Sequence, residues 1–392
     1  MKSKNERRLF LKRLAMGIAA TTLAERTLSA NDNTVIPPFN VTMSDSSRTE
    51  QEIFRDIPSV LDYDGVYNSL TQDSYEGLQR AFDNERELVM PRDFRCKVSQ
   101  PLIIKKRGFS LRGGSKVATQ IHATHNGNVI EVGDIGSTSG FAPRCTLENF
   151  SIYGSGIQTG GIVLWDKKSN SGWGDASKAC RLSNLIINDI GGGPMLRIRS
   201  WANYIEHVET TQGCLYGIIL EQQALSNTFI HPYITGCIKE GIIIGDLPER
   251  EETCNCSFYG AIVQQCGGEA SSGAIVINGA ASTSFYDLYL ERNGEKGASY
   301  DINITDKAVL TEIRNVTSRG AIKSALIRDA GINTVVRNVW RYGDADSIIR
   351  RVGSVVTGDY RGFFLASGNT PNGNIRDLAT GQATGRYTTS DY

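Results

Sequence analysis

A small group of charged and aromatic residues follows a repeated apolar pattern in the middle of the chain. Glu221 comes directly after the run Gly-Ile-Ile-Leu, and Trp165, Arg199 and Asp246 stand at or just beyond the ends of related runs. Carboxylates and a guanidinium are groups that general acid–base catalysis uses, provided that the fold brings them within hydrogen-bond reach. The elements that carry these residues therefore decide whether they can act together.

Those elements repeat along the sequence. From residue 145 onward, one motif recurs: an apolar residue, any residue, a polar or small residue and a second apolar residue, followed by an alternating strand. Such a repeat of short strands and turns predicts coils stacked in a solenoid. Asn suits the turn because it tolerates left-handed backbone angles and bonds its own backbone. The predicted corners are Asn149, Asn184, His207, His231, Gly260, Asp287, Asn315 and Asn338.

These corners make the chain similar to right-handed parallel β-helices of the pectate-lyase and phage-tailspike type, with their asparagine ladder. Earlier segments agree: Ser59–Gly65 resembles the opening strand, Tyr75–Phe82 the capping helix, and Leu88–Pro91 and Ser110–Gly114 the strand marks of that family. The resemblance implies an all-β fold, a right-handed parallel β-helix over residues 57–360 with a short N-terminal capping helix. Residues 31–56 are then an extended linker and residues 361–392 a C-terminal tail.

Alternation along the strand after each corner places alternate side chains outward. In four of the eight coils these outward positions carry aromatic residues, which we call the aromatic stripe: Tyr153, Tyr233, Tyr289, and Trp340 with Tyr342. Exposed aromatic rings suit stacking of sugar rings, but they suit a protein–protein interface equally well. The stripe therefore predicts either a glycan-binding face or the axis of a homotrimer.

The second strand of each coil carries the other predicted site. In the resembled family, this strand forms the floor of the sugar-binding cleft. Two long turns follow it, at residues 167–176 and 247–253, and long turns on one edge of a solenoid often line a groove. The residues predicted to bind substrate are Trp165, Arg197, Trp173, Tyr289 and Trp340.

Cleavage of a polysaccharide chain requires one of two arrangements of groups. Hydrolysis uses two carboxylates about 5 Å or roughly 6.5–9.5 Å apart, whereas elimination from a uronate uses a base and a cation that neutralises the substrate carboxylate. Glu221 is predicted as acid or base, with Asp246 as its partner in hydrolysis. In an elimination, Arg199 would be the base or would neutralise the carboxylate. The alternative is an ordinary Arg–Glu pair on a wet surface, which contributes little.

A second set of catalytic candidates lies on the aromatic stripe: Glu209, Tyr233 and Glu291. Glu209 and Glu291 are three coils apart, roughly 14 Å at about 4.8 Å per coil. That spacing excludes a direct carboxylate pair, so either residue would act alone beside a tyrosine.

The histidines and cysteines favour structural roles. His207 and His231 stand in the corner ladder, and His122 and His125 have no further His or Cys nearby for a zinc site. No Asp cluster marks a calcium site, so no cofactor is predicted, although calcium stays open. Cys145–Cys180 and Cys237–Cys266 are the plausible disulfides, and buried free thiols are favoured over them.

The N-terminus and the overall charge limit where the protein works. Arg7-Arg8-Leu9-Phe10-Leu11-Lys12 resembles the twin-arginine export motif, so residues 1–30 are predicted to be a signal peptide and the mature protein periplasmic or secreted. A basic amphipathic helix is the alternative. The apolar stretch from Leu14 to Ala24 is too short to span a membrane. Lys and Arg (42) balance Asp and Glu (42), which argues against a nucleic-acid partner.

Two functions remain for such a chain. The first is an exported lyase or glycoside hydrolase that cleaves an acidic exopolysaccharide or polyuronate. The second is a non-catalytic glycan-binding or assembly protein, or a tailspike-like trimeric depolymerase.

Overall fold

The computed structural model describes the chain from residue 57 onward with several gaps. The described ranges are residues 57–133, 142–165, 177–221, 224–245, 253–268, 272–322, 324–343, 347–352, 358–367 and 375–377. The predicted signal peptide and the linker lie outside these ranges. The predicted end of the β-helix at residue 360 is too early, because β28 (Gly358–Ser367) and β29 (Ile375–Asp377) continue the two sheets into the predicted tail, the rest of which lies outside the described residues. Residues from Ile57 onward belong to one compact unit.

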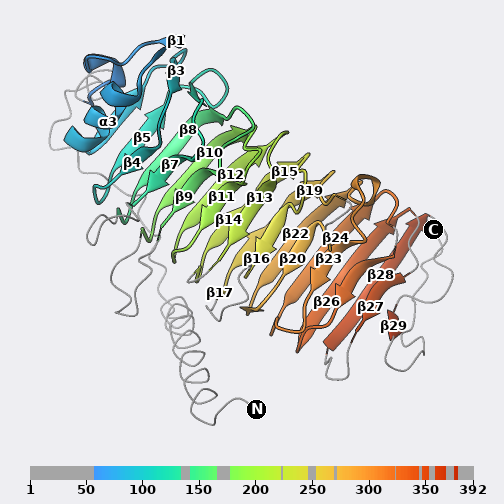
Figure 1. Cartoon of the computed structure of the whole chain (residues 1–392). Coiled ribbons are helices and arrows are strands. Elements are labelled where there is room, and N and C mark those ends of the chain that lie inside the picture. Colours follow the sequence, from blue (N-terminus) through green and yellow to red (C-terminus); the bar gives the residue numbers. More distant parts are fainter. Residues whose placement is uncertain are drawn as a thin grey trace, which may run out of the picture. The chain divides into compact units, whose positions relative to one another are not determined.

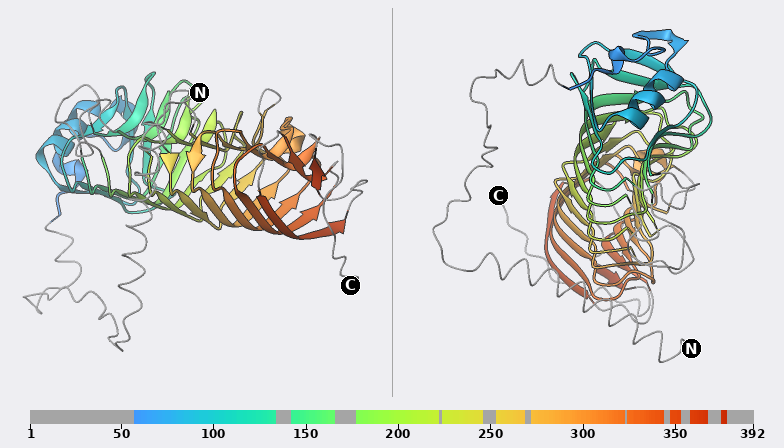
Figure 2. Two further views of the ribbon diagram at one scale, coloured as in Figure 1. Left: turned by 90° about the horizontal axis from the view of Figure 1, so that it is seen from below. Right: turned by 90° about the vertical axis from the view of Figure 1, so that its left-hand side faces the viewer.

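Within the described residues this unit is a parallel β-solenoid, as predicted. Two long sheets run side by side along its axis, and each strand pairs in parallel with strands of the coils above and below (Figure 1). The view along the unit in Figure 2 shows the coils stacked one behind another. The repeat therefore buries its apolar side chains between the sheets and leaves the outer face of each sheet available for other contacts.

The strand before each corner and the strand after it form a 16-stranded sheet among the described residues. Its strands are β1 (Ser69–Asp73), β2 (Glu87–Met90), β3 (Arg95–Val98), β5 (Ser110–Gly113), β6 (Gln120–Ala123), β8 (Thr146–Tyr153), β10 (Arg181–Asn188), β12 (Tyr204–Thr210), β14 (Thr228–Ile230), β15 (Tyr233–Thr235), β18 (Ser257–Tyr259), β19 (Ile262–Gln264), β22 (Ser284–Glu291), β24 (Glu312–Arg319), β26 (Thr334–Tyr342) and β28 (Gly358–Ser367).

The second strand of each coil builds an 11-stranded sheet within the same described part. Its strands are β4 (Leu102–Ile104), β7 (Asn128–Val132), β9 (Gly160–Leu164), β11 (Pro194–Ile198), β13 (Tyr216–Leu220), β16 (Ile242–Ile244), β20 (Ile275–Ile277), β23 (Tyr300–Ile304), β25 (Ala325–Asp329), β27 (Ser347–Arg351) and β29 (Ile375–Asp377). Two short strands, β17 (Thr253–Cys254) and β21 (Ala280–Ala281), pair separately. We call the outer surface of the 11-stranded sheet the second-strand face.

All eight predicted corners have left-handed backbone angles, with φ between 48° and 62°. Their side chains form a ladder along the axis: Asn184 Nδ2 donates to Asn149 Oδ1 at 2.8 Å, and Asn338 Nδ2 donates to Asn315 Oδ1 at 3.0 Å. These hydrogen bonds satisfy polar groups at the turns and fix the register of one coil on the next. The predicted asparagine ladder is confirmed.

His207 and His231 belong to this ladder. Their rings stack with centroids 5.5 Å apart, and the next corner is Gly260. A Cβ at residue 260 would lie 2.3 Å from Nδ1 of His231, so glycine leaves the space that the imidazole fills. The structural role predicted for the two histidines fits this packing.

The interior is built from stacked apolar side chains. Phe229, Phe258 and Phe285 occupy the same position in three successive coils, with ring centroids 4.3 and 4.6 Å apart. All eight cysteines are free thiols, and seven of them are buried. Burial raises the pKa of the Cys256 thiol to about 12, which suits a small apolar role.

The N-terminal end is covered by a helix, α3 (Tyr75–Asn84), where Tyr75–Phe82 was predicted. Its buried side is made by Leu78, Ala81 and Phe82. The opening strand predicted at Ser59–Gly65 is wrong, because Val60–Asp62 forms the 3₁₀ turn η1. A capping box explains it: the Ser59 hydroxyl accepts from the backbone of Leu61, and Asp62 accepts from the backbone of Ser59 at 2.8 Å. A second 3₁₀ turn, η2, spans Gly294–Lys296.

Candidate functional site

The second-strand face brings the predicted residues into one column. Leu164 pairs with Ile198, Ile198 with Leu220, and Leu220 with Ile244. The residues that follow, Trp165, Arg199, Glu221 and Gly245, therefore lie side by side on successive coils. Arg197 stands two residues before Arg199 on the same outward side.

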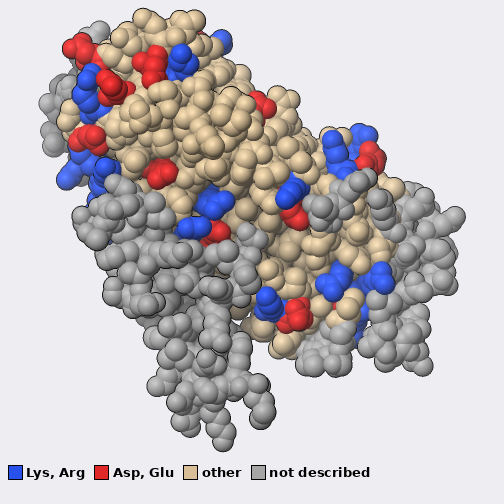
Figure 3. Space-filling view, viewed as in Figure 1, with Lys and Arg blue, Asp and Glu red and all other residues tan. Residues whose placement is uncertain are grey.

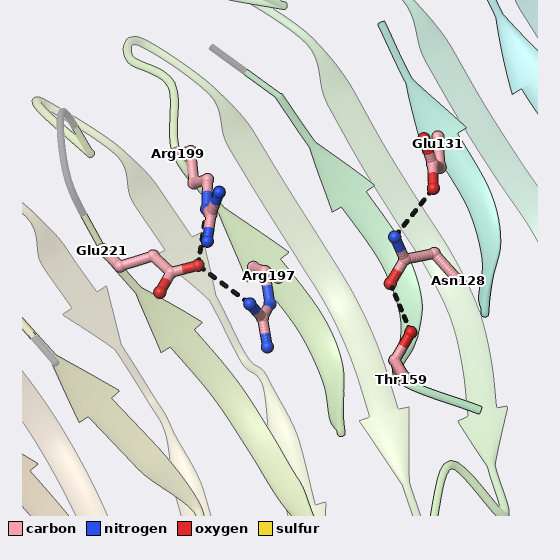
Figure 4. A network of polar contacts seen from close by, with 6 residues as sticks. All are labelled: Asn128, Glu131, Thr159, Arg197, Arg199 and Glu221. Atoms are coloured by element: carbon pink, nitrogen blue, oxygen red, sulfur yellow. Dashed lines mark hydrogen bonds and ion pairs between the residues drawn. The ribbon is translucent and has the colours of Figure 1, made fainter. Parts of the chain in front are cut away.

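Glu221 is held by both arginines. Its Oε1 accepts from Nε of Arg199 at 2.6 Å and from Nη1 of Arg197 at 3.2 Å (Figure 4). The Glu221 side chain is 3% exposed, that of Arg199 14% and that of Arg197 26%. The pair is therefore largely removed from water, and the wet-surface alternative does not describe it.

Trp165 extends this cluster on the far side of Arg199. The Arg199 guanidinium lies 4.8 Å from the centre of the Trp165 ring, and the indole nitrogen donates to Oε2 of Glu131 at 3.0 Å. Trp165 is 7% exposed. It orders Arg199 from the side, and only a small part of its ring is open to a ligand. We call Trp165, Arg197, Arg199 and Glu221 the charged cluster.

Glu131 is a site residue that sequence reasoning missed. It lies on β7, where Asn128 Nδ2 donates to its Oε1 at 2.8 Å and Thr159 Oγ1 donates to Asn128 Oδ1 at 3.4 Å (Figure 4). The alternation of Asn128–Val132 is a usable signal, but this segment precedes residue 145, where the recurring corner motif begins. Glu131 thus joins the cluster through Trp165 to the preceding coils.

The described residues bring no second carboxylate to Glu221. Glu131 lies three coils away, roughly 14 Å at about 4.8 Å per coil. Glu240 precedes β16 whereas Glu221 follows β13, so the two lie at opposite ends of neighbouring strands. Asp246, the predicted partner, and Trp173 lie outside the described residues.

A shallow depression of about 260 Å³ lies farther along the same face. Its lining residues are Tyr216, Lys239, Glu240, Ile243, Ser272, Val276 and Asn278. Lys239 donates to the Tyr216 hydroxyl at 3.2 Å, and this contact, with Glu240, raises the pKa of Lys239. The ammonium group of Lys239 and the apolar side chains of Ile243 and Val276 therefore lie on the same sheet as the charged cluster.

The aromatic stripe is less open than predicted. The same alternation that defines the stripe predicts outward side chains for Ser151, Ile186 and Asn188, but these three residues are buried. Ser151 lies against the turn that ends at Thr119, where its backbone and hydroxyl both donate to the Thr119 carbonyl oxygen. Trp340, at 42% exposed, is the open aromatic residue of the stripe.

The second set of catalytic candidates is engaged in local contacts. Glu209 forms an ion pair with Lys116 at 3.0 Å, and the Tyr233 hydroxyl donates to Gln264 at 3.4 Å. The Tyr289 hydroxyl donates to Glu291 at 3.0 Å; burial and then this contact raise the pKa of Tyr289. The structure therefore brings Tyr289 and Glu291 together but leaves them three coils from Glu209.

Two further features are absent from the residues that the structure describes. These residues contain no group of three or more His, Cys, Asp or Glu side chains placed to hold a metal ion. No helix among them has the length and apolar character needed to cross a membrane.

No family model and no curated protein matches the sequence. Solved structures do match. The catalytic domain of a GH87 α-1,3-glucanase in complex with tetrasaccharides has a TM-score of 0.59 at 11% identity, over 78% of this chain and 59% of that one. The enzymatically active domain of bacteriophage CBA120 tailspike protein 2 has a TM-score of 0.54 at 13% identity, over 82% and 46%.

The A-module of the Azotobacter vinelandii mannuronan C-5 epimerase AlgE4 has a TM-score of 0.53 at 11% identity, over 80% of this chain and 100% of that one. The chain thus spans less than two thirds of the glucanase and tailspike chains. At sequence identities this low, the structural similarity shows only a shared fold. The fold of this chain is a parallel β-solenoid. The glucanase and the epimerase are named for polysaccharides.

Proposed function

We propose that this protein binds an acidic polysaccharide along the second-strand face and cleaves it at the charged cluster. The observation that supports the proposal is the position of Glu221, which meets two guanidinium groups beside a tryptophan on one outer face. A uronate carries a carboxylate that such guanidinium groups recognise through charge-assisted hydrogen bonds. Export to the periplasm or the medium would bring the protein to such a substrate.

The set of groups favours elimination over hydrolysis. Hydrolysis needs two carboxylates at close range, and the described part of the face gives Glu221 two arginines instead. In the elimination, Arg197 and Arg199 bind the substrate carboxylate and Glu221 takes the proton on the adjacent carbon. The C4–O bond breaks, a C4–C5 double bond forms, and the leaving oxygen takes a proton from solvent. Hydrolysis with Asp246 as the partner remains the alternative chemistry.

A specific observation favours a second function, glycan binding without cleavage. The Glu221 carboxylate is nearly covered and accepts from both arginines, so proton transfer would have to replace those contacts. In that case the cluster would hold the face in shape, and the sugar chain would bind over it. A homotrimer assembled through the aromatic stripe is compatible with either function and is a separate prediction.

One experiment separates these functions. The protein is incubated with alginate, polygalacturonate and bacterial acidic exopolysaccharides, while the ultraviolet absorbance of unsaturated products and the reducing ends are followed together. We expect both signals to rise. Reducing ends alone would mean hydrolysis, binding with neither signal would mean the non-catalytic function, and absence of binding to every polymer would overturn the proposal.

A further inference from the structure

The C-terminal end of the second-strand face carries a row of arginines. Asn303 on β23 pairs in register with Arg328 on β25, and Arg328 pairs with Arg350 on β27. Neighbouring strands are about 4.8 Å apart, so the two arginine side chains start from adjacent points on one outer surface. Both are partly buried. In Figure 3 the Lys and Arg side chains gather over this end of the face.

The contacts of these two arginines are with neutral groups. Nη1 of Arg328 donates to Oδ1 of Asn303 at 2.9 Å, and Nη1 of Arg350 donates to the Ser324 hydroxyl at 2.9 Å. The Nε–H of Arg350 is buried without an acceptor among the described residues. Neither arginine forms an ion pair within the described chain. Arg112, Arg181, Arg197, Arg199, Arg292, Arg314 and Arg337 each have an acidic partner there.

The nearest acid along the strand does not compensate this charge. Asp329 follows Arg328, but alternation turns its side chain to the interior, where it accepts from the Tyr360 hydroxyl at 2.6 Å. Like charges on directly opposite residues of neighbouring strands destabilise a sheet. Two adjacent guanidinium groups with neutral partners thus oppose folding, while their other terminal N–H groups, unlike the buried Nε–H of Arg350, are available to an anion.

We propose that Arg328 and Arg350 form an anion-binding subsite for the carboxylate groups of an acidic polysaccharide. This inference rests on the proposed function and deepens it, because it assigns the negative charge of the substrate to a second place on the same face. Arg197 and Arg328 are five coils apart in register, roughly 24 Å at about 4.8 Å per coil. A bound chain would then run along the axis, from the charged cluster over the depression at Lys239 to the arginine row.

The test compares two double variants with the same change in charge. Arg328→Gln/Arg350→Gln removes the row, whereas Arg112→Gln/Arg292→Gln removes two exposed arginines whose partners are Glu148 and Glu295. Binding to alginate and polygalacturonate is measured by titration calorimetry at several salt concentrations, with dextran as the neutral polymer. We expect the row variant to bind the acidic polymers at least about tenfold more weakly and with a smaller salt dependence. The control should bind like wild type.

Thermal unfolding supplies the second measurement. Removing the repulsion should leave the melting temperature of the row variant unchanged or higher, whereas a loss of stability would mean that the arginines serve the fold and would overturn the inference. Equal affinity of the row variant and wild type for acidic polymers would overturn it while leaving the proposed function intact. Tighter binding of duplex DNA than of either uronate polymer would assign the row to another anion. If wild type binds no polysaccharide, both proposals fail together.

Discussion

The arginines at the two ends of the second-strand face have different hydrogen-bond partners. At the charged cluster, Arg197 and Arg199 converge on one nearly covered carboxylate, whereas Arg328 and Arg350 at the other end contact only an amide and a hydroxyl. A paired guanidinium is fixed in place by its partner, and an unpaired one keeps its charge available. Arginines on the same sheet thus fix the position of a carboxylate at the charged cluster, whereas in the arginine row their charge can attract an anionic ligand.

Removing the carboxylate from the charged cluster should have the largest effect, because both groups of arginines would then lack an acidic partner. Glu221→Gln leaves Arg197 and Arg199 without a carboxylate, as Arg328 and Arg350 are. We expect cleavage to fall at least about a hundredfold because the titrating group is lost. An ordinary Arg–Glu pair on a wet surface, the alternative considered from the sequence, would leave the stability of this variant almost unchanged. The burial of Glu221 revises that expectation to a loss on the order of 3 kcal/mol.

Denaturant unfolding and the product assay measure both effects of Glu221→Gln. Glu206→Gln is the matched control, because Glu206 forms an ion pair with Arg181 at 3.2 Å on a wet surface. That variant should change the unfolding free energy by no more than about 1 kcal/mol. Full activity of Glu221→Gln would remove Glu221 from the reaction and direct attention to Glu209, Tyr233 and Glu291.

The next effect concerns the residue that holds Arg199 from the side. Trp165→Phe loses the hydrogen bond to Glu131 and weakens the contact with the Arg199 guanidinium, so we expect a loss of about 1–2 kcal/mol in unfolding free energy. Tyr204→Phe keeps its ring beside Arg181 and should cost less than about 0.5 kcal/mol. Equal effects of the two substitutions in denaturant unfolding would mean that Trp165 does not order the cluster.

The fold could be predicted because its rules are local. Each corner needs a left-handed residue with apolar neighbours, and Asn149, Asn184 and Asn315 satisfy this rule directly in the sequence. Once the corners are placed, alternation gives the column of Trp165, Arg199 and Glu221. The helix at Tyr75–Asn84 was equally visible as an amphipathic stretch.

The rest depended on contacts between distant segments. Nothing near Ser151 in the sequence indicates that the turn ending at Thr119 covers it. The ion pair of Glu209 with Lys116 joins segments whose spacing carries no motif. Within the described part of the chain, Glu131 contacts the site through the indole of Trp165. Such contacts depend on how individual turns fold over the coils, and a repeat motif does not encode that.

A smaller change would give the arginine row the acid that it lacks. Asn303→Asp is nearly isosteric and places a carboxylate where Arg328 already donates a hydrogen bond. Pairing should offset the cost of burying the new charge, so stability should stay within about 1 kcal/mol of wild type. Affinity for alginate should fall severalfold, because Arg328 is then neutralised from within the chain.

The control for this variant is Asn338→Asp, in the corner ladder of the 16-stranded sheet. Asn338 is exposed and donates to Asn315 Oδ1 at 3.0 Å, so the substitution adds the same charge away from the second-strand face. Calorimetric titration should show the larger loss for Asn303→Asp. Equal losses would indicate a general effect of charge and would weaken the role given to Arg328.

The smallest expected effect is a pH dependence of the unfolding free energy that arises from Asp329, which lies beneath the arginine row. This carboxylate accepts from the Gly331 backbone at 2.8 Å, the Thr334 hydroxyl at 3.0 Å and the Tyr360 hydroxyl, yet burial raises its pKa. The folded state therefore keeps the proton at pH values where the unfolded chain has released it. Because of this difference, the unfolding free energy falls as pH rises from the unfolded pKa, about 3.9, through the raised folded pKa, and stays constant above it.

Asp329→Asn removes this pH dependence, because the amide does not titrate and its oxygen can still accept from Gly331 and Thr334. We expect the wild type to lose stability relative to the variant across that window, as measured by denaturant unfolding at a series of pH values. Asp301, whose pKa is also raised by burial, should add a similar contribution that Asp301→Asn abolishes. Parallel curves for wild type and Asp329→Asn would mean that Asp329 titrates alike in the folded and unfolded chains. The hydrogen bonds from Gly331, Thr334 and Tyr360 would then fully offset the effect of burial on the pKa of this carboxylate.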